Sequence, residues 1–280
     1  GLAKTLEQGL FDGLFIADIT GVYDVYQGNI DLTLKESIQL PSHDPSTLVS
    51  AMAAVTQNLG FGVTVNLSYE TPYQFARRFA SLDHLTQGRI GWNIVTGYLD
   101  SAARLIGQTG LQDHDLRYEQ AEEFLSLCYK FWEGSWEHDA VIKDKSQRIF
   151  TQPSKVHAIH HQGQFYHSQG VFQVSPSVQR TPVLFQAGAS TRGLSFATQH
   201  AEAMFIGADQ PAKVKQQVEQ IRAQARSQGL DPNQLKLLVG ISVITAETDE
   251  LAQQKLAEYI SYASPEAGLA HFGYAGTSHR

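Results

Sequence analysis

The feature that most constrains the fold is the regular alternation of short apolar runs with amphipathic helical segments along most of the chain. This alternation is typical of βαβ units, in which consecutive strands form a parallel sheet with helices packed against it. Six strands are expected, in the runs Phe11–Asp18, Gly60–Val65, Arg89–Val95, Thr181–Ala187, Ala203–Ile206 and Leu237–Thr245.

A closed (β/α)8 TIM barrel has eight strands, so these six predict a barrel that the chain covers only in part, with the first and last strands missing. The chain also begins with Gly1 rather than Met, and Ala3–Gly9 has the character of a helix already under way. We therefore expect residues before Gly1. An open doubly wound sheet is the alternative fold, although no Gly-x-Gly-x-x-Gly motif follows any of the strands.

Between the strands, apolar residues recur at helical spacing and predict which helix faces are buried. The helix starts at Asp44-Pro45 and Thr71-Pro72 are marked by proline, which is favoured at the first helical position. The predicted inner residues are Leu48, Met52 and Val55 in the first helix; Phe75, Phe79, Leu82 and Leu85 in the second; and Ala121, Phe124, Cys128 and Phe131 in a third, from about Leu116 to Trp132.

The stretch 134–180 breaks this rhythm, because it is polar and rich in histidine with scattered β-forming residues. We expect an excursion with short hairpins over one end of the barrel, where it would act as a lid. The histidine spacing is not that of the HExxH zinc helix. A solvated loop is therefore favoured over a metal site, and no metal ligands are expected; a metal-dependent hydrolase is the weaker alternative. The histidines are His157, His160, His161 and His167.

Composition limits the partners and the compartment. The 280 residues, 42% of them hydrophobic, suit one domain spanning residues 1–280. A net charge of −7 without a long basic run argues against nucleic acid and anionic membranes as partners. No apolar stretch is long enough to span a bilayer. Cys128 is the only cysteine, which excludes an intrachain disulfide and suits a reducing compartment such as the cytoplasm.

In parallel α/β folds ligands bind beyond the carboxyl ends of the strands. The residues at these exits carry hydroxyl, amide or small side chains and few acids, which suits a polar, uncharged ring system better than a metal. An asparagine there could hydrogen-bond the edge of a heterocycle or tie down a loop. The exit residues are Asp18; Thr64–Ser68; Asn93, Thr96 and Tyr98; and Gln186–Ser190.

The turn Gln186-Ala187-Gly188-Ala189-Ser190 joins a strand directly to a helix. Gly188 and Ala189 allow a ligand to approach the backbone closely, and Ser190 with the first helical N–H groups would face a phosphate. Ser190 could equally be a plain N-cap and Gly188 a tight turn. His114 and Tyr118, one helical turn apart, would share a face toward the barrel mouth, or His114 could belong to a capping cluster with Asp113 or Asp115.

The run Arg77–Thr96 resembles the nitrilotriacetate monooxygenase group of the luciferase-like flavin monooxygenase superfamily. Within this group the likeness is strongest to the long-chain alkane monooxygenases, and it covers essentially the whole chain. Further motifs that carry it are His114-Asp115-Leu116-Arg117-Tyr118, Gln186-Ala187-Gly188-Ala189-Ser190, Phe15–Asp18, Tyr23–Tyr26 and Lys155–His157.

This resemblance implies a bacterial-luciferase type barrel that uses reduced FMN, delivered by a separate NAD(P)H:flavin reductase. One oxygen atom of O2 would enter a small organic substrate, with a long-chain alkane as the candidate, and the other would leave as water. Because the family tends to self-associate, a homo-oligomer is expected. The alternative is a truncated, non-catalytic flavin-binding remnant, since an incomplete barrel exposes sheet edges and apolar interior.

The resemblance also implies site residues. Ala189 and Ser190 would hold the flavin phosphate, with Gly188 beside them. Tyr23, Gln39 and Tyr98 would face the substrate as candidate catalytic residues. Tyr98 stands where the alkane enzymes carry a histidine, which puts alkane specificity in doubt. The remaining cofactor-binding positions would be Asp18, Thr64, Asn93, Thr96, His114 and Tyr118.

Overall fold

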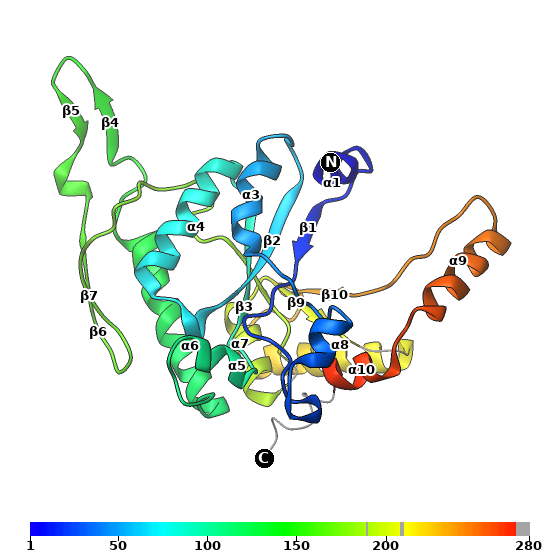
Figure 1. Cartoon of the computed structure of the whole chain (residues 1–280). Coiled ribbons are helices and arrows are strands. Elements are labelled where there is room, and N and C mark those ends of the chain that lie inside the picture. The colour runs from blue at the N-terminus through cyan, green and yellow to red at the C-terminus, as the bar shows by residue number, and fades with distance from the viewer. Residues whose placement is uncertain (189, 208–209, 273–280) are drawn as a thin grey trace. The chain divides into compact units, whose positions relative to one another are not determined.

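A six-stranded sheet dominates the computed structural model, which describes residues 1–188, 190–207 and 210–272 (Figure 1). The strands follow one another in sequence order, and the pairs with a described register are parallel. They are β1 (Gly13–Ile16), β2 (Gly60–Asn66), β3 (Ile90–Val95), β8 (Val183–Gln186), β9 (Ala203–Ile206) and β10 (Lys236–Val239).

This strand order decides between the two expected folds. A doubly wound sheet reverses its strand order at a switch point, whereas the order here runs from β1 to β10 without reversal. The doubly wound alternative is therefore wrong, and the winding is that of a half-barrel. All six predicted strands are confirmed, but β10 ends at Val239 rather than at Thr245.

A row of helices covers the outer face of the sheet, and each helix packs against the next one along the chain. Asp44 caps the first of them, since its Oδ1 accepts the N–H of Ser46 at 2.9 Å. None of the helices in the residues that the structure describes has the length and hydropathy needed to cross a bilayer. The row consists of α3 (Pro45–Ala53), α4 (Pro72–Thr86), α6 (His114–Tyr129), α7 (Thr191–His200) and α8 (Pro211–Ser227).

Two predicted helix faces need correction. Leu48 in α3 and Val55, just after its end, are exposed, while Val49 and Ala53 are buried against the sheet and α4. In α4, Leu85 is exposed and the neighbouring Thr86 is buried instead. The predicted and the observed buried residues both recur at helical spacing, so the spacing alone could not show which of two adjacent stripes is buried. The inner face predicted for α6 is confirmed.

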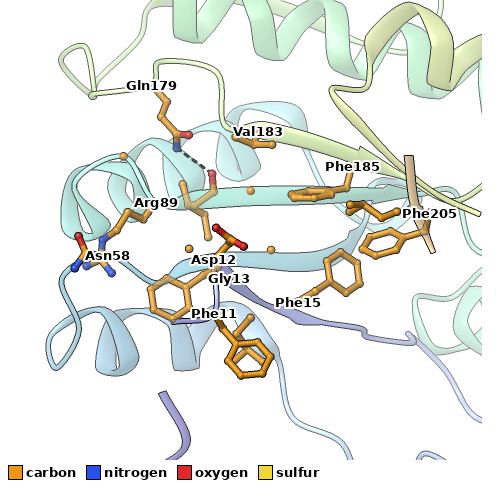
Figure 2. A pocket seen from close by; sticks show the side chains of 18 residues that line it. Phe11, Asp12, Gly13, Phe15, Asn58, Arg89, Gln179, Val183, Phe185 and Phe205 are labelled. Carbon is orange, nitrogen blue, oxygen red and sulfur yellow. Dashed lines mark hydrogen bonds between the residues drawn. The ribbon is translucent and has the colours of Figure 1, made fainter. Parts of the chain in front are cut away.

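Aromatic rings gather on the concave face of the sheet (Figure 2). The ring centroids of Phe15 in β1 and Phe205 in β9 lie 4.4 Å apart, and those of Phe15 and Phe185 in β8 lie 5.7 Å apart. In the sheet order, β2, β3 and β8 separate β1 from β9. Contact between strands so far apart requires a strongly curved sheet, as in the wall of a barrel.

Gly62 and Gly91, on the intervening strands, make room for these rings. A Cβ added at Gly62 would lie 2.9 Å from Cδ2 of Phe15, and one added at Gly91 would lie 2.6 Å from Cε2 of Phe185. Non-bonded carbon atoms pack best at about 3.5–4.0 Å. The rings can therefore lie across β2 and β3 only because these two positions have no side chain.

A cavity of about 600 Å³ borders the same concave face and is lined mainly by apolar residues. Its polar lining residues serve the fold. Arg89 donates hydrogen bonds to the carbonyl oxygens of Thr86 and Leu59, each at 2.8 Å. Gln179 donates through Nε2 to the carbonyl oxygen of Ile90 at 2.9 Å (Figure 2). Because these residues lie at the amino ends of the strands, we regard the cavity as barrel interior and not as the candidate site.

The 134–180 excursion forms short hairpins, as expected, and lies beside α4 and α6 (Figure 1). Glu123 of α6 accepts the backbone N–H groups of Phe165 at 2.9 Å and Tyr166 at 2.8 Å. The ring of Phe172 stacks on Phe131, just after α6. The predicted cover over one end of the barrel is wrong, because Ile159 and Phe172 of the excursion are buried in the same core as the inner residues of α4 and α6. The strands are β4 (Val141–Asp144), β5 (Ile149–Thr151), β6 (Ala158–Gln162) and β7 (His167–Val171).

The chain divides into two units, of which the sheet, its helices and the excursion form the first. The second unit consists of Ile19–His43, Gly97–Leu111 and the segment from Val239 onward. It contains α2 (Asp31–Lys35), α5 (Asp100–Leu105), α9 (Asp249–Ser261) and α10 (Pro265–Phe272). Ser101 joins two of its segments, since its Oγ accepts the N–H of Val22 at 2.9 Å and donates to the carbonyl oxygen of Val22 at 2.7 Å. The single domain over 1–280 stays a prediction.

Replacing Gly91 with alanine should destabilise the protein by about 1–3 kcal/mol, because the new methyl group would overlap the Phe185 ring. Urea unfolding followed by circular dichroism measures the loss. Gly134→Ala is the control, since a Cβ there meets only Cδ1 of Ile159 at an ordinary 3.7 Å. Equal stability of the two variants would contradict the packing argument.

Candidate active site

The turn after β8 carries a polar cluster at the start of α7. Ser190 is the N-cap of this helix, and its Oγ accepts the N–H of Gly193 at 3.0 Å. The N–H of Gly188 donates to Oε1 of Gln186. Ser190 therefore caps α7, as expected if this motif has a structural role. Ala189, a predicted phosphate ligand, lies outside the described residues.

Gly188 and Gly193 form a cradle around the hydroxyl of Tyr118. A Cβ added at Gly188 would lie 2.9 Å from the Tyr118 oxygen, and one added at Gly193 would lie 2.6 Å from it. Tyr118 is 6% exposed, and its hydroxyl hydrogen-bonds with Gln186 and Ser190. A buried phenol thus meets the positive end of α7.

His114 and Tyr118 share one side of α6, as predicted, with ring centroids 5.1 Å apart. The expected capping cluster is also present. Asp113 caps α6 by accepting the N–H of Asp115 at 2.9 Å, and Nδ1 of His114 lies 2.8 Å from Oδ1 of Asp115. The two interpretations are therefore compatible, because the cap fixes the helix start from which His114 and Tyr118 project.

The electrostatics of the cluster favour a neutral Tyr118 and a positive surrounding. Burial raises the pKa of Tyr118, and its hydrogen bonds with Gln186 and Ser190 oppose this only in part. The phenol therefore keeps its proton near neutral pH and can donate to an anion. Arg192, in the first turn of α7, adds positive charge, although its guanidinium lies 3.6 Å from Oε1 of Glu122.

A second polar pair joins two neighbouring strands of the sheet. Asn93 of β3 donates through Nδ2 to Oγ1 of Thr64 in β2 at 2.9 Å, and the two are 6% and 4% exposed. Oδ1 of Asn93 is buried, and no partner for it is found in the described part of the chain. An unmet buried acceptor costs about 1–3 kcal/mol, so this atom is suited to a ligand N–H or O–H.

Three further predicted positions lie within or just beyond strands of the sheet. The sequence placed Asn93 at the exit of the third strand, but this residue lies within β3. Thr96 follows the strand directly, and its carbonyl oxygen accepts the hydroxyl of Ser68 at 3.0 Å. Asp18 lies two residues beyond β1 and is half-buried.

The predicted substrate-side residues belong to the second unit, where Tyr23 and Tyr98 come together. Their hydroxyl oxygens are 2.7 Å apart. Burial and the hydrogen bond with Tyr98 raise the pKa of Tyr23, so the Tyr23 hydroxyl keeps its proton near neutral pH. Gln39 lies after α2 with an exposed side chain and a left-handed backbone, φ 51°, which non-glycine residues rarely adopt.

Two residues of these clusters were missed by sequence reasoning. The ring of His271 in α10 stacks on Tyr23 with centroids 4.9 Å apart. The Ser264-Pro265 pair was the available signal for α10, because it matches an N-cap followed by a first-turn proline. Gln186 was recognised as part of the turn but was given no role of its own.

Comparison with known proteins gives a consistent result. The family model of luciferase-like monooxygenases matches residues 1–280. A dimethyl-sulfide monooxygenase from Hyphomicrobium sulfonivorans is 50% identical over 97% of this chain and 57% of its own length. A long-chain alkane monooxygenase from Geobacillus thermodenitrificans is 48% identical over 97% of this chain and 62% of its own. Nitrilotriacetate monooxygenase component A from Aminobacter aminovorans is 33% identical over 96% and 60%.

Solved structures agree. The crystal structure of a long-chain alkane monooxygenase superposes with a TM-score of 0.95 at 47% identity, over 98% of this chain and 63% of that one. A riboflavin lyase solved with modified FMN and riboflavin superposes with a TM-score of 0.92 at 41% identity, over 98% and 61%. The chain therefore spans about three fifths of the length of the relatives it matches.

Ser190→Ala should lower the free energy of unfolding by about 1 kcal/mol, because the N–H of Gly193 loses its capping acceptor. Ser190→Asp should keep most of the stability, since aspartate is an equally good N-cap. Urea unfolding of both variants measures this difference. A Ser190→Ala protein as stable as the wild type would mean that the cap contributes nothing.

Proposed function

This chain belongs to the luciferase-like monooxygenase family, and on that premise we propose that it forms the flavin-binding part of an FMNH2-dependent, two-component monooxygenase. The enzyme would insert one oxygen atom of O2 into a small organic substrate. The observation that carries the proposal is the polar cluster of Tyr118, Gln186 and Ser190 at the start of α7.

The start of α7 fits the phosphate of FMN. Free N–H groups and the helix dipole attract an anion at a helix N-terminus. Tyr118 is held neutral by burial and can donate a hydrogen bond. His114 in the first turn of α6 and Arg192 in the first turn of α7 would supply further donors. We assign Gly188, Ala189, Ser190, His114 and Tyr118 to the phosphate end.

The sheet offers a partner for the flavin ring. A reduced isoalloxazine carries N–H donors, and the buried Oδ1 of Asn93 is an acceptor that lacks a partner among the described residues. We assign Asn93, Thr64, Thr96 and Asp18 to the ring and ribityl portion. When bound, reduced FMN supplies the electrons that activate O2; the protein holds the flavin by these groups and excludes water.

The substrate side is assigned to the second unit. The hydroxyl groups of Tyr23 and Tyr98, which lie 2.7 Å apart, and the amide of Gln39 would face the substrate. Dimethyl sulfide and long-chain alkanes are the substrates named for two similar proteins. We infer a small, largely apolar substrate, and Tyr98 in place of the histidine of alkane enzymes argues for one other than a long-chain alkane.

The partners follow from the same assignment. The similar nitrilotriacetate enzyme is named as component A, so we infer that a separate NAD(P)H:flavin reductase supplies FMNH2. A homo-oligomer in the cytoplasm and a barrel completed to eight strands are parts of the same proposal. The alternative of a non-catalytic remnant finds no support, because the similar proteins are named monooxygenases.

Binding titrations test the phosphate assignment. Fluorescence quenching should show that the protein binds FMN at least roughly tenfold more tightly than riboflavin, because hydrogen bonds to a charged group contribute about 1.5–3 kcal/mol. Ser190→Asp should abolish this preference while keeping the fold, because a carboxylate repels the phosphate. Equal affinity of the wild type for the two flavins would refute the assignment.

Turnover tests the reaction. With a flavin reductase, NADH and isotopically labelled O2, the protein should transfer one labelled oxygen atom to a member of a panel of sulfides, alkanes and amines. Mass spectrometry of the products measures this transfer. Tyr98→Phe should lower kcat more than it lowers flavin affinity. Tight FMN binding with peroxide as the sole product for every compound would favour the remnant.

A further inference from the structure

Gln186 is only 4% exposed, and its side-chain amide has hydrogen-bond partners in the turn and in α6. Its Oε1 accepts the N–H of Gly188. A Cβ built on Gly188 would lie 2.8 Å from Nε2 of Gln186, 3.0 Å from its Oε1 and 2.9 Å from the Tyr118 oxygen, and the Gln186 side chain hydrogen-bonds with the Tyr118 hydroxyl. Because a backbone N–H can only donate, the carbonyl end of the amide must face Gly188.

This orientation fixes the direction of the next hydrogen bond. With Oε1 engaged by Gly188, we infer that the hydrogen bond between Gln186 and Tyr118 is made by Nε2, which can only donate. The Tyr118 oxygen is therefore an acceptor from Gln186, and the phenol proton must point elsewhere. The N–H of Gly188 thus fixes the orientation of the Gln186 amide, and the amide in turn fixes the orientation of the buried Tyr118 hydroxyl.

The Tyr118–Ser190 pair has one hydroxyl proton left to donate to a ligand. The oxygen of Ser190 accepts the N–H of Gly193 at 3.0 Å, and the hydroxyls of Ser190 and Tyr118 hydrogen-bond with each other. Both oxygens already accept from a nitrogen, and the two hydroxyls carry two protons. Their mutual bond uses one proton, so one is left to donate outward.

We propose that Gln186 is a positioning residue that orients the Tyr118 hydroxyl, so that the Tyr118–Ser190 pair always presents one O–H donor to the flavin phosphate. This inference rests on the proposed function, because it needs a phosphate at the start of α7. Gln186 acts through Tyr118 and does not itself touch the ligand.

A glutamine that only fills space would behave differently. Its loss would lower stability and weaken the binding of every flavin alike. A residue that orients a phosphate donor changes the ratio of FMN affinity to riboflavin affinity, because riboflavin lacks the phosphate. This ratio is therefore the readout that separates the two roles.

The test is a double-mutant cycle with Gln186→Met and Tyr118→Phe, titrated with oxidised FMN and with riboflavin. Gln186→Met should lower the FMN-to-riboflavin affinity ratio roughly tenfold, the effect of one hydrogen bond to a charged group. In the Tyr118→Phe background it should cause no further loss, because the oriented proton is already gone. Fully additive losses, or equal losses for both flavins, would overturn the proposal.

A matched control is available on α6. Gln120 donates through Nε2 to the hydroxyl of Tyr166 at 2.8 Å, so Gln120→Met removes a similar glutamine–tyrosine bond away from the turn. This variant should keep the wild-type affinity ratio. A fall equal to that of Gln186→Met would count against a specific role for Gln186.

A second variant covers the case in which Gln186→Met does not fold. Gln186→Glu keeps the shape and the acceptor for Gly188 but can no longer donate to Tyr118, so the phenol must give its proton to the carboxylate. Its affinity ratio should fall in the Tyr118 protein more than in the Tyr118→Phe protein. A wild type without preference for FMN would sink the proposed phosphate site itself, whereas a preference unchanged in all Gln186 variants would sink only this inference.

Discussion

The packing of three phenylalanine rings over two glycines is the constraint on which the rest of the first unit depends. Phe15, Phe185 and Phe205 meet on the concave face only because Gly62 and Gly91 carry no side chain. This contact holds the sheet in a curve, and the curve directs the carboxyl ends of its parallel strands toward a common region. The polar groups that follow β3 and β8, which are parallel neighbours, therefore lie at the same edge of a curved sheet.

Much of the fold could be read from the sequence because alternating strands and helices have strong periodic signals. All six strands and the capped start of α3 were predicted correctly. The buried stripe of α3 was not, since Leu48 and Val49 both belong to stripes with helical spacing. The position of the 134–180 excursion was also missed, because it depends on contacts such as those of Glu123 with Phe165 and Tyr166, which join distant parts of the chain.

The candidate site could be predicted as a set of residue types but not as a network. Sequence motifs pointed to Tyr118 and Ser190, and the structure brings both to the start of α7. They could not show that the amide of Gln186 bridges Gly188 and Tyr118, because this depends on side-chain orientation. The unmet oxygen of Asn93 was likewise invisible, since a missing partner is a property of three-dimensional packing.

The second unit is assembled from loops that leave the sheet after β1, after β3 and after β10. Tyr23 and Tyr98 come from the first two of these loops and His271 from the third. None of the three belongs to a strand of the sheet. Such a division allows the loop sequences to change while the strands of the sheet keep their residues.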